Sequence, residues 1–227
     1  MLFEDRIQAG RILAQRLMHW ADRSGTLVLG LPRGGVPVAF EVARALNAPL
    51  DVFIVRKLGV PGQEELAMGA IAPQQVVIID KMLIDHLRIS AQALQAVIDR
   101  ETEELARREQ AYRGRLPPLD VKGRSVILID DGLATGSTMR AAIASLKKQQ
   151  PSRLVIAVPV GAPQTCDEIR PTVDELICAA TPEPFYGVGR WYENFSQTTD
   201  KEVQHLLSQA RQDQSKADSS RPPSSPR

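Results

Sequence analysis

Two adjacent carboxylates stand at the end of an apolar run in the second half of the chain. Val126 to Ile129 is followed directly by Asp130 and Asp131, and ligands of open parallel sheets collect at this end of a buried strand. Paired carboxylates can accept hydrogen bonds from two neighbouring sugar hydroxyls, or hold the water shell of a metal ion. They would repel a phosphate, so we assign them to a diol or to a hydrated metal ion.

A stretch of small residues just beyond the acid pair has the composition of a phosphate site. Thr135, Ser137 and Thr138 carry hydroxyls, and Gly136 lets the backbone approach an anion closely. The N–H groups that open the following helix would point at such an anion. An ordinary turn and helix start is the alternative, but the whole combination from 126 to 138 favours a ligand site. An acid pair beside a phosphate site predicts a sugar phosphate as the ligand.

Strand and helix patterns alternate along most of the chain. This alternation, with near-continuous apolar runs, predicts an α/β fold with a mainly parallel central sheet and helices on both faces. A helical insertion is expected at about 82–115, capped by Ser90 and with a solvated charged face. Strands are expected at 26–29, 51–55, 68–71, 76–79, 126–129, 154–158 and 173–178, and the other helices within 1–20 and at 36–46, 137–148 and 165–169.

Bulk properties narrow the class of protein. The chain has 227 residues, 43% of them hydrophobic, and a formal charge of +1, so we expect one domain over 1–212 and no general attraction to nucleic acid or anionic membranes. The sequence has neither an 18-residue apolar run nor a signal-peptide pattern, so a cytoplasmic protein is expected. Cys166 and Cys178 match no zinc or redox spacing. The polar segment 213–227 is expected to be a disordered tail.

The segment from Val126 to Thr138 resembles the signature of the type I phosphoribosyltransferases, in which four apolar residues and two acids precede a phosphate loop containing Thr-Gly. The resemblance implies that Asp130 and Asp131 hold the ribose hydroxyls of phosphoribosyl pyrophosphate. It also implies that Ala134 to Thr138 hold the 5-phosphate, and that a small hood region accompanies the sheet. Gly132 departs from the pattern, which often has a larger residue here.

Two earlier stretches extend the resemblance. Leu31 to Gly35 looks like the family's pyrophosphate loop, in which backbone N–H groups of Arg33, Gly34 and Gly35 would meet the leaving diphosphate. Its composition is also that of a common turn. Arg56 and Lys57, followed by residues up to Glu65, resemble the mobile loop that closes over the active site, although a bland exposed loop is the rival interpretation.

An aromatic-rich stretch near the end, Phe185 to Phe195, resembles the part of purine-type relatives that stacks on the base. Trp191 or Tyr192 could do so here, and packing in the core is an equal alternative for either ring. The acceptor is not identified by any residue, but the apolar surroundings of Trp191 favour a nucleobase.

Taken together, the resemblance implies a magnesium-dependent enzyme that transfers ribose 5-phosphate from phosphoribosyl pyrophosphate to a nitrogen nucleophile. Arg33, Lys57, Asp130 and Asp131 are the expected catalytic residues, with magnesium bound through the substrate and, by way of water, through one of the two acids. Two alternatives stay open on the same fold: a sensor of phosphoribosyl pyrophosphate without transfer activity, and an RNA-binding regulator. A homodimer is compatible with the sequence.

Overall fold

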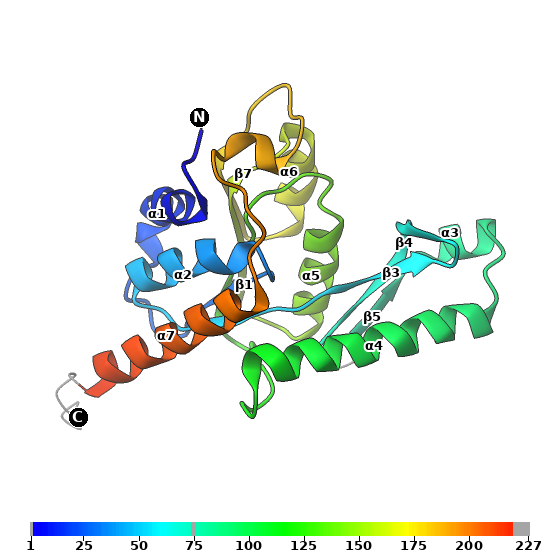
Figure 1. Cartoon of the computed structure of the whole chain (residues 1–227), viewed down its shortest axis with the longest axis horizontal. Helices are drawn as coiled ribbons and strands as arrows, with labels where there is room; N and C mark the ends of the chain where they lie inside the picture. Colours follow the sequence, from blue (N-terminus) through cyan, green and yellow to red (C-terminus); the bar gives the residue numbers. More distant parts are fainter. Residues whose placement is uncertain (1, 74–75, 220–227) are drawn as a thin grey trace.

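The computed structural model describes residues 2–73 and 76–219, and its centre is a five-stranded parallel sheet (Figure 1). Each strand pairs with its neighbour in the same direction, which confirms the predicted mainly parallel sheet. In spatial order the strands are β2 (Leu50–Val52), β1 (Thr26–Gly30), β6 (Ser125–Ile129), β7 (Arg153–Val160) and β8 (Glu175–Ala180).

Helices cover both faces of this sheet, because alternate residues of its buried strands point to opposite sides. Ile127 and Ile129 face one apolar core, and Val126 and Leu128 face the other. The first core is covered by α1 (Arg6–Arg16), α2 (Gly35–Leu46) and α7 (Asp200–Ser219), and the second by α5 (Ser137–Lys148) and α6 (Pro163–Ile169). The α/β fold with helices on both faces is therefore confirmed.

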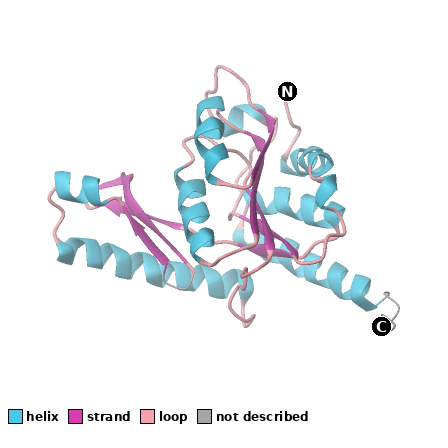
Figure 2. Ribbon diagram, turned by 180° about the vertical axis from the view of Figure 1, so that it is seen from behind, coloured by secondary structure: helices cyan, strands magenta, loops and turns pink. Residues whose placement is uncertain are grey.

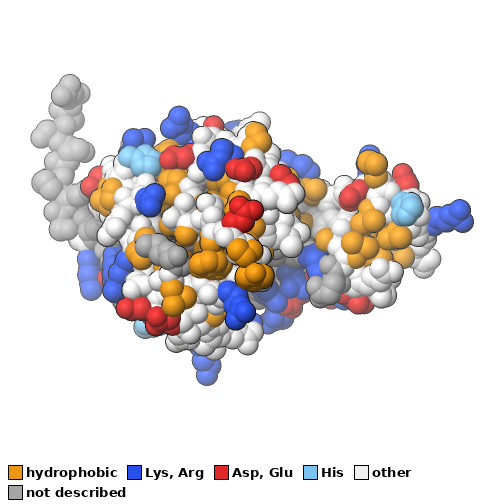
Figure 3. Space-filling view, turned by 90° about the horizontal axis from the view of Figure 1, so that it is seen from above, with side chains coloured by type: hydrophobic (Ala, Val, Ile, Leu, Met, Phe, Trp, Pro, Cys, Tyr) orange, Lys and Arg blue, Asp and Glu red, His pale blue; other side chains and the backbone are white. Residues whose placement is uncertain are grey.

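A second, antiparallel sheet forms an arm that extends away from the main sheet (Figure 2). The long helix α4 runs beneath this sheet, and its cap at Ser90 agrees with the prediction. Figure 3 shows the end of the arm as a separate lobe with exposed hydrophobic side chains. Met82 in this part of the chain is exposed. The elements of the arm are β3 (Arg56–Val60), β4 (Gln63–Ala72), β5 (Val76–Ile79), α3 (Lys81–His86) and α4 (Ala91–Arg113).

The arm corrects one expectation. Residues 56–65, predicted as an irregular loop, form most of a β-hairpin that turns at Gly62, whose φ is +79°. Leu58 and Val60 are buried on one face of this hairpin, so alternate burial gives a strand from a sequence that otherwise reads as polar.

The C-terminal segment corrects the expectation of a disordered tail over 213–227. The prediction of disorder from residue 213 is wrong for residues 213–219, because α7 continues through Ser219; residues 220–227 lie outside the described part of the chain. Val203 and Leu207 anchor the first half of this helix in the core. None of the helices in the described residues has the length and apolar character needed to cross a membrane.

Candidate functional site

Two loops meet at the carboxyl ends of β1 and β6, the pair of strands at which the order of the sheet reverses. From β1 the chain continues to β2 on one side, and from β6 to β7 on the other. Their helices, α2 and α5, lie on opposite faces of the sheet, and this divergence opens a crevice at the strand ends. The loop at 31–35 follows β1, and the acid pair with the loop at 134–138 follows β6. The Leu31 N–H donates to the Ile129 carbonyl at 2.8 Å, which joins the two loops.

Glycine is required where the first loop meets the acid pair. A Cβ atom at Gly34 would lie 2.0 Å from Asp131 Oδ2, and one at Gly35 would lie 2.9 Å from the Asp130 Cα. No side chain fits at either position unless the acids move. The structure therefore brings together Gly34, Gly35 and both acids, as the sequence predicted for adjacent parts of one site.

The two carboxylates of the acid pair are half-buried and lie next to each other. Burial raises the pKa of Asp130 well above its usual range, and the neighbouring charge of Asp131 raises it further. Burial also raises the pKa of Asp131, although the nearby Arg6 guanidinium opposes this shift. The Asp131 N–H donates to Asp130 Oδ1 at 2.9 Å. The pair is thus costly to ionise twice, which is the state that a ligand rich in hydroxyl donors would stabilise.

The second loop has the geometry of an anion site. Gly136 has a φ of +75° and precedes α5, whose first residue is Ser137, so free N–H groups and the positive end of the helix dipole face the loop. Thr165 on α6 supports the loop from below, since its hydroxyl donates to the Ala134 carbonyl at 2.6 Å. A Cβ at Gly136 would lie 2.7 Å from the Thr165 methyl group.

A cavity of about 160 Å³ joins Asp130 to this loop. Val188 covers it, since the Val188 side chain lies 2.4 Å from where a Cβ at Gly132 would stand. A residue larger than glycine at 132 would therefore displace Val188. The lining residues are Asp130, Gly132, Leu133, Ala134, Thr135, Gly136, Ser137, Thr138, Met139 and Val188.

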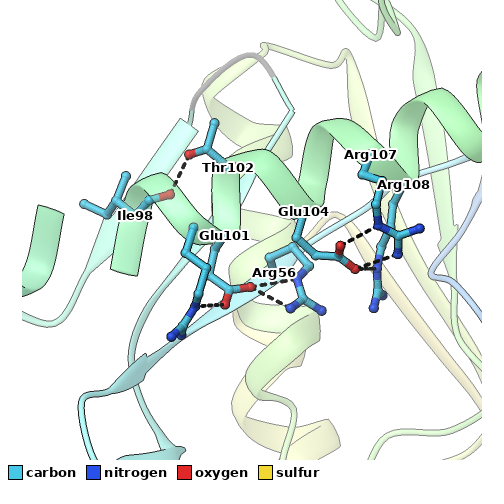
Figure 4. A network of polar contacts seen from close by, with 8 residues as sticks. Arg56, Ile98, Glu101, Thr102, Glu104, Arg107 and Arg108 are labelled. Atoms are coloured by element: carbon cyan, nitrogen blue, oxygen red, sulfur yellow. Dashed lines mark hydrogen bonds and ion pairs between the residues drawn. The ribbon is translucent and has the colours of Figure 1, made fainter. Parts of the chain in front are cut away.

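Arg56 and Lys57, two of the predicted cationic site residues, have different surroundings. Arg56 and Lys57 are neighbours on β3, so their side chains point to opposite faces of the arm. Arg56 donates to Glu101 of α4 at 2.6 and 2.9 Å (Figure 4). Lys57 instead lines a groove of about 500 Å³ between the arm and α5, which it shares with Ser137 and Thr138. Of these two cations, the lysine therefore lies on the side of the phosphate loop.

Arg33 lies between the first loop and α7. Its Nη1 is 3.8 Å from Asp200 Oδ1, and about a third of its side chain is exposed. Asp200 also accepts a hydrogen bond from the Tyr112 hydroxyl of α4 at 2.5 Å. Since the contact of Arg33 with Asp200 is long and partly exposed, an incoming anion can compete for the guanidinium.

Neither predicted base-stacking ring lines the cavity. Tyr192 is buried, and its hydroxyl donates to the Asp131 carbonyl at 2.6 Å. Trp191 packs beside Phe3 and Tyr192 in a small apolar cluster, and among the described residues its buried Nε1 has no hydrogen-bond partner. Core packing, the alternative that the sequence left open, describes Tyr192. In the same stretch Tyr186 is 77% exposed, so it is a ring that is free to meet a ligand.

Two ion pairs could not be predicted from the sequence, one at the candidate site and one on the arm. Arg6 forms an ion pair with Asp131, 125 positions away, with Nε 2.8 Å from Oδ2. Glu101, which holds Arg56, follows the apolar stripe of α4 and is 7% exposed. The helical period could show that Glu101 faces inward, but local sequence patterns could not reveal its arginine partner.

The comparisons with known proteins agree with this geometry. Residues 4–188 match the family model described as the phosphoribosyl transferase domain. The chain is 44% identical over 212 residues to a protein of Mycobacterium tuberculosis (strain ATCC 25618 / H37Rv) named "Putative phosphoribosyl transferase", a match covering 93% of this chain and 48% of the relative. The chain thus spans about half the length of this curated relative.

The chain is also similar to a solved structure and to a second curated protein. The crystal structure of the protein TT1426 from Thermus thermophilus has a TM-score of 0.79 and 38% identity, covering 91% of this chain and 98% of that one. A uracil phosphoribosyltransferase of Lactobacillus gasseri is 29% identical over 173 residues, covering 74% of this chain and 80% of the relative.

Proposed function

This chain belongs to the phosphoribosyl transferase domain family, and on that premise we propose that it transfers ribose 5-phosphate from phosphoribosyl pyrophosphate to a nitrogen nucleophile, a nucleobase, with release of pyrophosphate. The observation that carries the proposal is the cavity shared by Asp130 and the loop from Ala134 to Thr138. One end of this cavity offers carboxylate acceptors for a diol, and the other offers N–H and hydroxyl donors for a phosphate. Ribose 5-phosphate has both groups.

The two loops would bind different charged groups of the donor substrate. The 5-phosphate would accept hydrogen bonds from the loop that opens α5, and Asp130 and Asp131 would accept them from the ribose hydroxyls. The diphosphate would then extend toward Gly34 and Gly35, which touch the acids, and toward Arg33. These donors would stabilise the negative charge that builds on pyrophosphate as the bond to C1 breaks.

Magnesium fits this site as an ion held mainly by the substrate. Across residues 2–73 and 76–219, no cluster of three or more His, Cys, Asp or Glu side chains could hold a metal ion. Two carboxylates suit magnesium, which keeps several waters and binds phosphate oxygens. Bound in this way, magnesium would neutralise the diphosphate and make it a better leaving group.

A nucleobase acceptor is supported by two features. Tyr186, an exposed ring in the stretch that also supplies Val188, can stack on a planar base. The relative from Lactobacillus gasseri is named as a uracil phosphoribosyltransferase. As the bond between nitrogen and C1 forms, the proton of the attacking nitrogen would pass to water, because the titratable side chain among the described residues that line the cavity, Asp130, would hold the ribose.

The proposal is tested by incubating the protein with phosphoribosyl pyrophosphate, magnesium and each base of a purine and pyrimidine panel, and measuring pyrophosphate. We expect release that depends on one base. Tight binding of phosphoribosyl pyrophosphate by calorimetry without release for any base would indicate a sensor. A salt-dependent shift of RNA in a gel would indicate an RNA-binding regulator. Either outcome would overturn the assignment as an enzyme.

A further inference from the structure

We propose that Arg6 is a positioning residue of the phosphoribosyl site, which acts through Asp131 to keep one carboxylate of the acid pair in place and ready to accept a ribose hydroxyl. This inference rests on the proposed function, because it assigns the acid pair to ribose. Arg6 lies on α1, outside both ligand loops, and it does not line the cavity.

The contacts of Arg6 fix its guanidinium on three sides. Its Nε donates to Asp131 Oδ2 at 2.8 Å, and its Nη1 donates to the Ser196 carbonyl at 2.7 Å. The guanidinium carbon stands 4.0 Å from the centre of the Phe195 ring. The side chain is 12% exposed. A planar, permanently charged group that both stacks and donates in fixed directions suits this position, which a lysine could fill only in part.

Arg6 also joins parts of the chain that are distant in sequence. The N-terminal segment pairs with the segment after η3 (Val188–Trp191), since the Phe3 N–H donates to the Trp191 carbonyl and the Glu193 N–H to the Phe3 carbonyl, both at 2.8 Å. Tyr192 in turn holds the Asp131 backbone. Asp131 therefore accepts hydrogen bonds at its backbone carbonyl from Tyr192 and at its carboxylate from Arg6. Because the arginine uses Oδ2, a ribose hydroxyl can donate to Oδ1.

The test is calorimetric binding of phosphoribosyl pyrophosphate with magnesium at neutral pH. Arg6→Gln should raise the Kd about tenfold or more, because the charge-assisted hydrogen bond that holds the Asp131 carboxylate is lost. Arg6→Lys should recover part of the lost affinity, because lysine keeps the charge and one donor but not the planar fork. The matched control is Arg11→Gln on the same helix, because Arg11 pairs with Glu41 and should leave the Kd unchanged.

A double-mutant cycle separates a role through Asp131 from a general effect on folding. Once Asp131 is changed to Asn, adding Arg6→Gln should weaken binding by less than about twofold, because the group on which Arg6 acts is gone. This comparison can still be made if Arg6→Gln alone does not fold, since the double variant no longer leaves the acid at position 131 without its arginine.

The outcomes are distinct from those for the proposed function. If the parent binds no phosphoribosyl pyrophosphate, the proposed function fails first, and this inference fails with it. If the parent binds but Arg6→Gln leaves the Kd unchanged, or the two substitutions are additive, the assignment of Arg6 is overturned while the proposed function stands.

Discussion

Asp131 on the main sheet and Glu101 on the arm are both carboxylates held by an arginine, and the two pairs have nearly the same geometry. Arg6 Nε lies 2.8 Å from Asp131, and Arg56 Nε lies 2.9 Å from Glu101. Their surroundings differ in the balance of charge. Glu101 has two arginines, Arg56 and Arg100, whereas Arg6 faces two acids.

This difference suits a structural ion pair on the arm and the proposed binding site at the strand ends. On the arm, the positive charge matches or exceeds the negative charge, so the pair ties β3 to α4 without a further partner. At the strand ends, one arginine faces two acids, and under the proposed function the ribose hydroxyls would supply further hydrogen-bond donors. A half-buried excess of acid therefore favours a functional role, which the salt-bridge distance alone does not indicate.

The largest expected effect comes from removing the negative charge of Asp130 and Asp131. Asp130→Asn combined with Asp131→Asn should lower kcat/KM about 1000-fold or more, because two groups that fix and polarise the ribose are lost. The fold should persist, as the acids lie beyond the end of β6. Circular dichroism checks folding, and pyrophosphate release and calorimetry check function. Unchanged affinity for phosphoribosyl pyrophosphate would remove the acid pair from the site.

Lys57 is the cation of the β3 pair that faces the phosphate loop, and its loss should have the next largest effect. Lys57→Ala should lower kcat/KM about 100-fold, the cost typical of one charge-stabilising donor. Because Lys57 shares a groove with Ser137 and Thr138, we expect the Kd of phosphoribosyl pyrophosphate to rise as well as kcat to fall. Lys81→Ala, at the exposed start of α3, is the control, and an effect of equal size there would refute a local role for Lys57.

A smaller effect is expected for the structural pair. Glu101→Gln should lower the free energy of unfolding by about 1–2 kcal/mol, since a buried, charge-assisted hydrogen bond is weakened. The cost should appear as faster hydrogen exchange in β3 and α4. Glu104→Gln is the matched control, because Glu104 pairs with Arg107 and Arg108 on the surface and should cost less than about 1 kcal/mol. Equal losses in the two variants would show that the burial of Glu101 is not what matters.

The smallest expected effect is on thermal stability, and it comes from removing the charge of Asp130. The folded-state pKa of Asp130 is raised, so its ionised form opposes folding at neutral pH, and this cost disappears as the pH falls below the ordinary value for aspartate. Asp130→Asn should therefore raise the Tm by about 2–4 °C at pH 7.5, the shift expected for about 1 kcal/mol in a chain of this size. The gain should shrink at pH 4. A lower Tm at pH 7.5 would contradict the cost assigned to this charge.

Local signals in the sequence were enough to predict the two elements that flank the candidate site. The apolar run before Asp130 and the helix start at Ser137 define β6 and α5 almost to the residue, because strand burial, glycine conformation and helix capping act over a few residues. The partners of these groups could not be predicted. Arg6 reads as one polar position of an amphipathic helix, and only the packing of α1 against the sheet brings it to Asp131.

The first strand of the arm and the last helix escaped prediction for a related reason. In β3 only every second side chain is buried against α4, so Arg56 and Lys57 made the segment look like a loop. In α7 the apolar anchors Val203 and Leu207 lie near its start, and the polar second half gives no periodic signal.

The pairing of β1 with β6 has a consequence for how this protein can change over evolutionary time. Their register joins Gly30 to Ile129, so the two halves of the site come together only when a loop of about 100 residues closes, and the arm lies within that loop. The entropy of closure grows slowly with length, by about 0.6 kcal/mol for each doubling. Insertions or deletions in the arm should therefore be tolerated while the acid pair stays where it is.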